Sequence, residues 1–105
     1  MSLQASTLEK LHALEAIYQE GYHNDVIDRI MEKVVHLERE HAQHDLTALQ
    51  HRVQTFETQY QMDSETFHTR FHNGELGDEA DFFEWSALHD MHQSIRKRLQ
   101  TLAVA

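Results

Sequence analysis

An all-α fold is predicted for this chain by three features of its sequence. Proline is absent, and the three glycines lie at positions 21, 74 and 77, so helix breakers are almost confined to two places. Apolar residues recur at intervals of three and four, which is the period of an amphipathic helix. β-branched residues are scattered instead of gathering in short runs. We therefore expect one all-helical domain over residues 1–105, with helices at about 7–22, 25–61, 64–73 and 79–102.

The first two helices are separated by a short polar connection. The first helix buries an apolar stripe formed by Leu8, Leu11, Leu14, Ile17 and Tyr18. Gly21 loosens its end, because glycine is the weakest helix former after proline. Asn24 is then a suitable N-cap for a second helix that meets no breaker before about residue 61.

The long second helix carries two apolar faces that differ in phase. Its first half has a wide face made of Val26, Ile27, Ile30, Met31, Val34, Val35 and Leu37. Its second half has a narrower seam, stepping by four and three, made of Ala42, Leu46, Leu49, Val53, Phe56 and Tyr60. The phase slips over residues 38–45, where we expect the helix to bend or to change packing partners.

The rest of the chain reads as a corner followed by a returning helix. Asp63 or Ser64 can cap a short helix, whose Phe67 and Phe71 face the core and which ends at Gly74. Asp78 is the expected cap of the last helix. The seam of that helix consists of Trp85, Leu88, His92, Ile95, Leu99 and Leu102. Its period matches the second half of the long helix, which predicts an antiparallel helical hairpin with residues 63–77 as the corner.

Simple dimensions indicate an elongated hairpin. A helix over residues 25–61 would be about 55 Å long, whereas a compact chain of this length has a radius of gyration of only about 13 Å. Such a hairpin leaves much of the face from Val26 to Leu37 uncovered unless the first helix or a second chain packs on it. A homodimer is the economical solution.

Composition and charge exclude several classes of function. A formal net charge of −9 argues against direct nucleic-acid binding, because phosphate contacts need clustered Lys and Arg. The basic cluster at residues 96–98 fits a helix C-terminus better. The absence of cysteine excludes disulfides and thiolate chemistry. No apolar run approaches the roughly 20 residues of a membrane span, and the first residues do not resemble a secretory leader. We expect a cytoplasmic protein.

Enzymatic activity is not expected. None of the five serines lies in a glycine elbow of the hydrolase type. Gly74 and Gly77 stand among carboxylates, which would repel a phosphate. No cofactor is expected either.

A metal-binding helical bundle is the alternative interpretation. The chain has ten histidines, and His68 and His72 lie four residues apart on one helical face. Glu65 and His68, like Glu38 and His41, have the Glu-x-x-His spacing of di-iron bundles. Such a bundle needs two further inward glutamates, which the sequence does not identify, and pairs at this spacing arise by chance in a chain so rich in histidine and acid. No metal ligand is therefore assigned.

The most distinctive segment is GELGDEADFFEW, residues 74–85, which we call the acidic aromatic segment. No Lys or Arg occurs between Arg70 and Arg96. The three aromatic residues cannot share one face of a helix, because neighbouring positions differ by about 100°. We expect core packing to take two of them and leave one exposed among the carboxylates as a contact for a basic protein. The candidate partner-binding residues are Glu75, Asp78, Glu79, Asp81, Phe82, Phe83 and Trp85.

A family resemblance points the same way. The pattern from Leu14 to Asp28, the run YQMDSE from Tyr60, and the acidic aromatic segment with the following SAL together resemble a family of small prokaryotic helical proteins. That family is associated with antitoxin-like genes encoded beside a small toxin-like partner. The resemblance covers nearly the whole chain and implies a binding role without catalytic residues.

Overall fold

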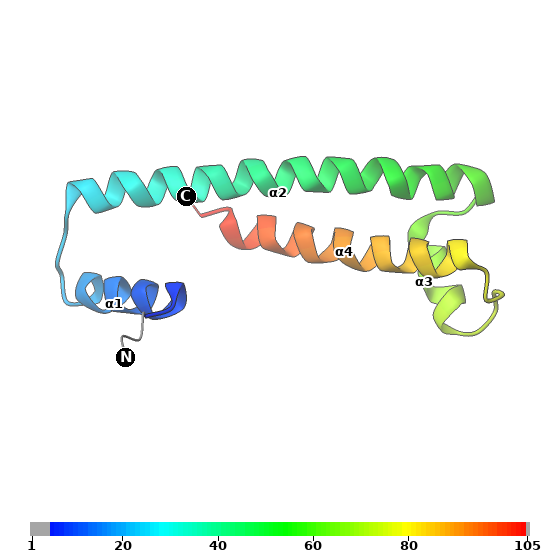
Figure 1. Ribbon diagram of the computed structural model, residues 1–105, viewed down its shortest axis with the longest axis horizontal. Helices are drawn as coiled ribbons and strands as arrows, with labels where there is room; N and C mark the ends of the chain where they lie inside the picture. The colour runs from blue at the N-terminus through cyan, green and yellow to red at the C-terminus, as the bar shows by residue number, and fades with distance from the viewer. Residues whose placement is uncertain (1–4, 105) are drawn as a thin grey trace. The chain divides into compact units, whose positions relative to one another are not determined.

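The computed structural model describes residues 5–104, which form four α-helices and no strand. These helices are α1 (Thr7–Gln19), α2 (Asp25–Tyr60), α3 (Ser64–His72) and α4 (Ala80–Leu102), as Figure 1 shows. The predicted all-α fold is confirmed, and the helix bounds lie close to the predicted ones. None of these helices is both long and apolar enough to cross a bilayer.

Most of the predicted helix ends are correct. The Asn24 side chain accepts hydrogen bonds from the backbone N–H groups of Val26 and Ile27, at 2.9 and 3.1 Å. Asp63 caps α3 by accepting from the N–H of Thr66 at 2.8 Å, and this bond lowers the pKa of the Asp63 carboxyl. The predicted Asp78 cap is wrong: Glu79 occupies the N-cap of α4 and makes no side-chain capping bond.

Glycine ends two of the helices. Gly21 has a φ of +97° and Gly74 a φ of +73°, in the left-handed region that glycine adopts without steric cost. The turn around Gly21 begins earlier than predicted, so α1 ends at Gln19 instead of near residue 22. The turn at Gly74 releases the chain from α3 into the loop that leads to α4.

The chain forms two compact units whose boundary lies after Val34, within α2. The first unit contains α1 and the beginning of α2, and α2 continues through the boundary into the second. Within the first unit the Tyr18 hydroxyl donates to the Asp28 carboxylate at 2.8 Å. Partial burial, together with this bond, raises the pKa of Tyr18.

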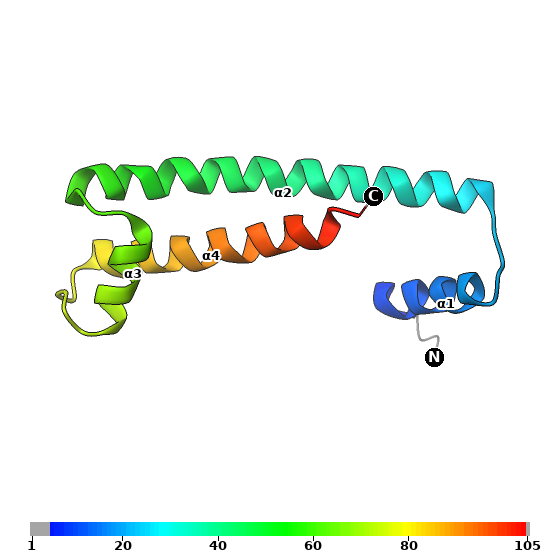
Figure 2. The same ribbon diagram turned by 180° about the vertical axis from the view of Figure 1, so that it is seen from behind.

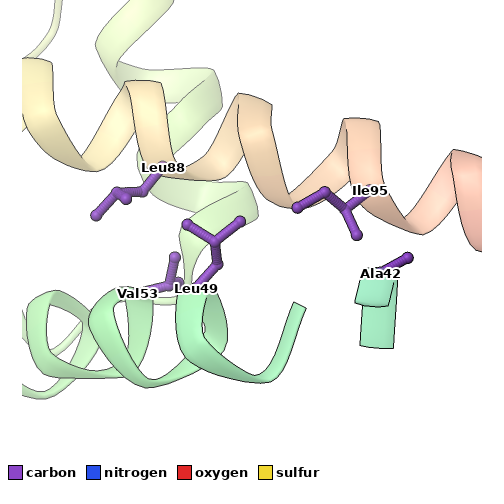
Figure 3. Packing of buried hydrophobic residues seen from close by; sticks show 5 residues of the cluster. All are labelled: Ala42, Leu49, Val53, Leu88 and Ile95. Atoms are coloured by element: carbon purple, nitrogen blue, oxygen red, sulfur yellow. The ribbon is translucent and has the colours of Figure 1, made fainter. Parts of the chain in front are cut away.

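The second unit contains the predicted antiparallel hairpin. In both views α4 lies beside α2, and α3 lies at the corner between them (Figures 1 and 2). The antiparallel sense is fixed at one end by Arg39, whose Nε donates to the backbone oxygen of Leu102 at 2.6 Å. The side chains of the core point toward one another from the two helices in Figure 3, and they are Ala42, Leu49, Val53, Leu88 and Ile95. The predicted pairing of the two seams is confirmed.

Stacked aromatic rings fill the corner of the hairpin. Phe67 of α3 and Trp85 of α4 have no exposed surface, and their ring centroids are 3.8 Å apart in nearly parallel planes. Phe56 of α2 stacks on Trp85, with the two ring centroids 5.8 Å apart. Aromatic side chains bury large areas with few rotatable bonds, so this cluster holds the start of α4 firmly against α2 and α3.

Candidate protein-binding surface

The acidic aromatic segment begins as a loop and ends as the first turns of α4. The loop covers residues 73–79, and α4 begins at Ala80. Glu75, Asp78 and Glu79 are all exposed on it. Loop backbone that is anchored at both ends by packed helices commonly carries binding residues.

The three aromatic side chains of the segment point in different directions, as helical geometry requires. Trp85 is fully buried, and Phe82, one turn earlier, packs at 5.8 Å from Phe67 and 5.2 Å from Tyr60. Phe83 is rotated away from this inward face and keeps 58% of its surface exposed. Its ring packs nearly perpendicular to the ring of Phe71, with the two centroids 5.3 Å apart.

Asp81 is held inside the hairpin instead of facing a partner freely. Its carboxylate accepts a hydrogen bond of 2.6 Å from the Tyr60 hydroxyl. That bond, with desolvation and the negative charge of Asp81, raises the pKa of Tyr60 to about 12. Asp81 therefore links the first turn of α4 to the last turn of α2.

Glu84 was not among the predicted site residues, although it lies beside Phe83. It forms an exposed ion pair with Arg52 of α2, at 2.9 Å. This ion pair neutralises the charge of Arg52, which lies on α2 opposite the start of α4. Sequence spacing gives no signal for this contact, because the two residues come from different helices.

The predicted site residues thus separate into three groups. Glu75, Asp78, Glu79 and Phe83 are exposed, and we call these four residues the acidic Phe83 surface. Asp81 and Phe82 are half-buried and support it from within. The expectation that Trp85 contacts a partner is corrected, because its side chain is completely buried.

Among residues 5–104, neither Glu-x-x-His motif belongs to a group of three or more possible ligands that lie close together. Within that range, ligand atoms come close enough to share an ion in one group, formed by His23, Asp25 and Asp28 in the first unit. His23 and Asp25 are exposed, and the Asp28 carboxylate is already bonded to Tyr18 and to His23 Nε2. This arrangement is a largely exposed cluster of paired polar groups at the start of α2.

The second unit also has a polar hollow of about 280 Å³ beside the corner. Its wall includes Glu57, Ser64, His89 and His92. The Ser64 hydroxyl donates to the Glu57 carboxylate at 2.9 Å, so both groups serve the packing of the corner. The pKa of His89 is lowered mainly by burial and to a lesser extent by the nearby charge of His68. The pKa of His92 is lowered mainly by burial and to a lesser extent by the charge of Arg96.

Comparison with protein-family models, with curated proteins and with solved structures yields no match to this chain.

Proposed function

We propose that this chain is a non-catalytic, cytoplasmic interaction protein of the antitoxin-like kind, which binds and masks a basic protein partner through the acidic Phe83 surface. The observation that carries this proposal is the exposure of Phe83, at 58% of its surface, in the same short segment as the exposed carboxylates of Glu75, Asp78 and Glu79. With more than half of its surface exposed, the ring contributes little to the core. Contact with another protein gives it a role.

The packing behind Phe83 supports this role. Protein interfaces draw much of their affinity from a few aromatic anchors that lie within a polar rim. The ring of Phe83 packs against Phe71 of α3, and the buried Trp85 anchors the start of α4, on which Phe83 lies. An anchor on a rigid support loses little side-chain entropy when it binds.

The charge distribution selects a basic partner. The chain carries a formal charge of −9. Six of its carboxylates lie between Arg70 and Arg96, where there is no Lys or Arg. Such a field raises the rate of encounter with a positively charged protein and disfavours acidic ones. Glu79, at the N-cap of α4, is four residues before Phe83, so the segment carries a carboxylate about one helical turn from the ring in sequence.

Masking follows from the same complementarity. A protein that binds nucleic acid does so through clustered Lys and Arg, and a surface of carboxylates can occupy those side chains in place of phosphates. The resemblance of the chain to antitoxin-like proteins supports a partner of this type. The mechanism is steric and electrostatic and needs no cofactor.

The test begins with identification of the partner inside the native cell. A photo-reactive phenylalanine analogue placed at Phe83 should cross-link to a small basic protein, with the product of the adjacent open reading frame as the first candidate. The same analogue placed at Met91, which is similarly exposed on α4, should not give this product. If both positions capture the same proteins, the capture is not specific to the acidic Phe83 surface.

Binding of the purified partner then tests the charge. The triple variant Glu75→Gln, Asp78→Asn and Glu79→Gln should weaken binding strongly, because it removes three exposed carboxylates and leaves the Asp81 bond to Tyr60 intact. The matched control removes three exposed carboxylates elsewhere, through Glu20→Gln, Glu32→Gln and Glu38→Gln. Equal binding by the two variants would contradict the proposed surface.

A further inference from the structure

The first unit has no buried side chain among its described residues. The predicted burial of the apolar stripe of α1 is wrong, because no residue of α1 is buried. The buried residues of α2 begin at Ala42, beyond the end of this unit. Helices of this length are marginal in water unless an apolar face packs against something. The exposed apolar side chains of the unit, each with 38% to 63% of its surface accessible, are Leu8, Leu11, Ile17, Tyr22, Val26, Ile30 and Val34.

The apolar side chains of the first unit, exposed and half-buried, form a groove and a ridge. The groove has a volume of about 440 Å³ and is lined almost entirely by apolar atoms, from Leu11, Leu14, Tyr18, Ile27 and Met31. The ridge consists of Val26, Ile30 and Val34, which are spaced four residues apart and therefore share one face of α2. A ridge of side chains that packs into a groove is the usual geometry of helix–helix contact.

The charges at the edges of the groove and the ridge are complementary. Glu15 and Asp28 are the acidic residues that line the groove. Arg29 and Lys33 are exposed and lie beside the ridge on α2, on a row that begins with the exposed Asp25 and has a net positive charge. Placing the ridge of one molecule in the groove of another brings a basic edge toward an acidic rim, and a two-fold axis makes this contact twice.

We propose that a second copy of this chain covers the first unit, with the ridge of each copy in the groove of the other. The exposed apolar side chains together with the groove offer on the order of several hundred Å² per chain, the scale of one side of a standard interface of about 800 Å². From each copy, α1 and the first part of α2 then surround a shared apolar core. This proposal does not depend on the acidic Phe83 surface, which belongs to the second unit.

Sedimentation equilibrium of the full chain tests the proposal directly. The wild-type protein should sediment with twice the mass of one chain. Ile30→Asp should weaken the dimer at least about a hundredfold, because it buries an unpaired charge in the interface. The control Met91→Asp changes a residue of similar exposure on α4 and should alter the dissociation constant by no more than about twofold.

A cross-linking experiment keeps the test independent of a folding defect. The chain has no cysteine, so single thiols can be placed at will. Ile30→Cys protein is mixed with Leu11→Cys protein and treated with a short thiol-reactive linker. The cross-link between one chain of each variant should form in preference to a cross-link between two chains of the same variant. A monomeric wild-type chain, a dimer insensitive to Ile30→Asp, or a dimer without the cross-link between the two variants would each overturn the proposal.

Discussion

The indole Nε1 of Trp85 donates a hydrogen bond of 2.9 Å to the hydroxyl of Ser64, inside the corner of the hairpin. The same hydroxyl donates to the Glu57 carboxylate at 2.9 Å, and the backbone N–H of Ser64 reaches that carboxylate at 2.8 Å. One short chain of bonds thus joins α4, α3 and α2. It satisfies the polar atom of the fully buried indole, which would otherwise be costly to bury.

Removing the Ser64 hydroxyl should therefore destabilise the second unit. Ser64→Ala leaves the Trp85 N–H without its partner and deletes one bond to Glu57, and we expect a loss of about 1 to 3 kcal/mol. Urea denaturation followed by circular dichroism measures the change. Ser94→Ala, at an exposed position on α4, should change stability by less than about 0.5 kcal/mol. Similar losses in both variants would show that the buried bonds are unimportant.

The hairpin seam should be even more sensitive to charge. Leu49 is 6% exposed and lies in the core between α2 and α4. Leu49→Asp should cost several kcal/mol, about 3 or more, because a carboxylate enters an apolar contact without a partner. Ala48→Asp, at the neighbouring exposed position, is the control and should be well tolerated. Thermal unfolding of the two variants checks the difference, and a tolerated Leu49→Asp would contradict the assigned core.

Helix positions and their pairing were accessible from the sequence because both depend on local patterns. The step of three and four from Ala42 to Tyr60 gave the buried face of α2, and a matching step in α4 gave its partner. The cap at Asp63 and the left-handed turn at Gly74 follow from the chemistry of those residue types. The cap of α4 did not follow, since Asp78 and Glu79 are adjacent acids and the choice between them depends on how the loop packs.

The candidate site was predictable only in outline. Helical geometry required one aromatic residue of the acidic aromatic segment to face away from the others, but it did not say which. The ring cluster around Phe67 decides it, because Trp85 completes that cluster and Phe83 is left outside. The burial of His89 was also missed: its position in α4 lies one residue from the seam position Leu88, and only the docking of α3 covers it.

Protein purified without an affinity tag should carry no stoichiometric iron, zinc or manganese. His23 and Asp25 are exposed, and the Asp28 carboxylate is already bonded to Tyr18 and paired with His23, so little binding energy is available for an ion. Elemental analysis checks this prediction. About one ion per chain, lost in His23→Ala, His41→Ala or His68→Ala, would instead favour the metal-binding alternative.

Stability should fall as the pH decreases, and His89 should contribute to the fall. His89 is 8% exposed, and its ring centroid lies 4.7 Å from that of His68. Burial and the charge of His68 lower the pKa of His89, and the carboxylates of Asp90, Glu65 and Glu57 act in the opposite direction. Its pKa in the folded state is below the ordinary value of about 6.5, so the unfolded chain binds more protons there. The stabilisation is complete above about pH 6.5 and is lost as the pH falls through the lower, folded-state pKa.

Chemical denaturation at about pH 7.5 and about pH 5.5, on either side of the ordinary histidine pKa, measures this effect. His89→Leu removes the buried titrating group and should reduce the pH dependence of the unfolding free energy. His44→Gln is the control, because the His44 side chain is 83% exposed and its removal should leave the dependence nearly unchanged. An unchanged slope in His89→Leu would mean that other groups dominate acid destabilisation.

Association with the basic partner should weaken over the same range of pH. The formal charge is −9 with neutral histidines, and protonation of all ten would bring it to −9 + 10 = +1. Lowering the pH from about 7.5 to about 5.5 protonates most exposed histidines but leaves most carboxylates ionised, so the attractive field largely disappears. Added salt should have a similar effect at pH 7.5, because steering is screened beyond about 8 to 10 Å.

The association rate constant, measured by stopped-flow fluorescence at several salt concentrations, separates this long-range effect from loss of the contact itself. Phe83→Ala should accelerate dissociation and leave the salt dependence of association unchanged, because it removes the anchor and no charge. The triple variant of Glu75, Asp78 and Glu79 should slow association and flatten its salt dependence. If Phe83→Ala has no effect on dissociation, the exposed ring is not part of the interface, and the carboxylates alone account for binding.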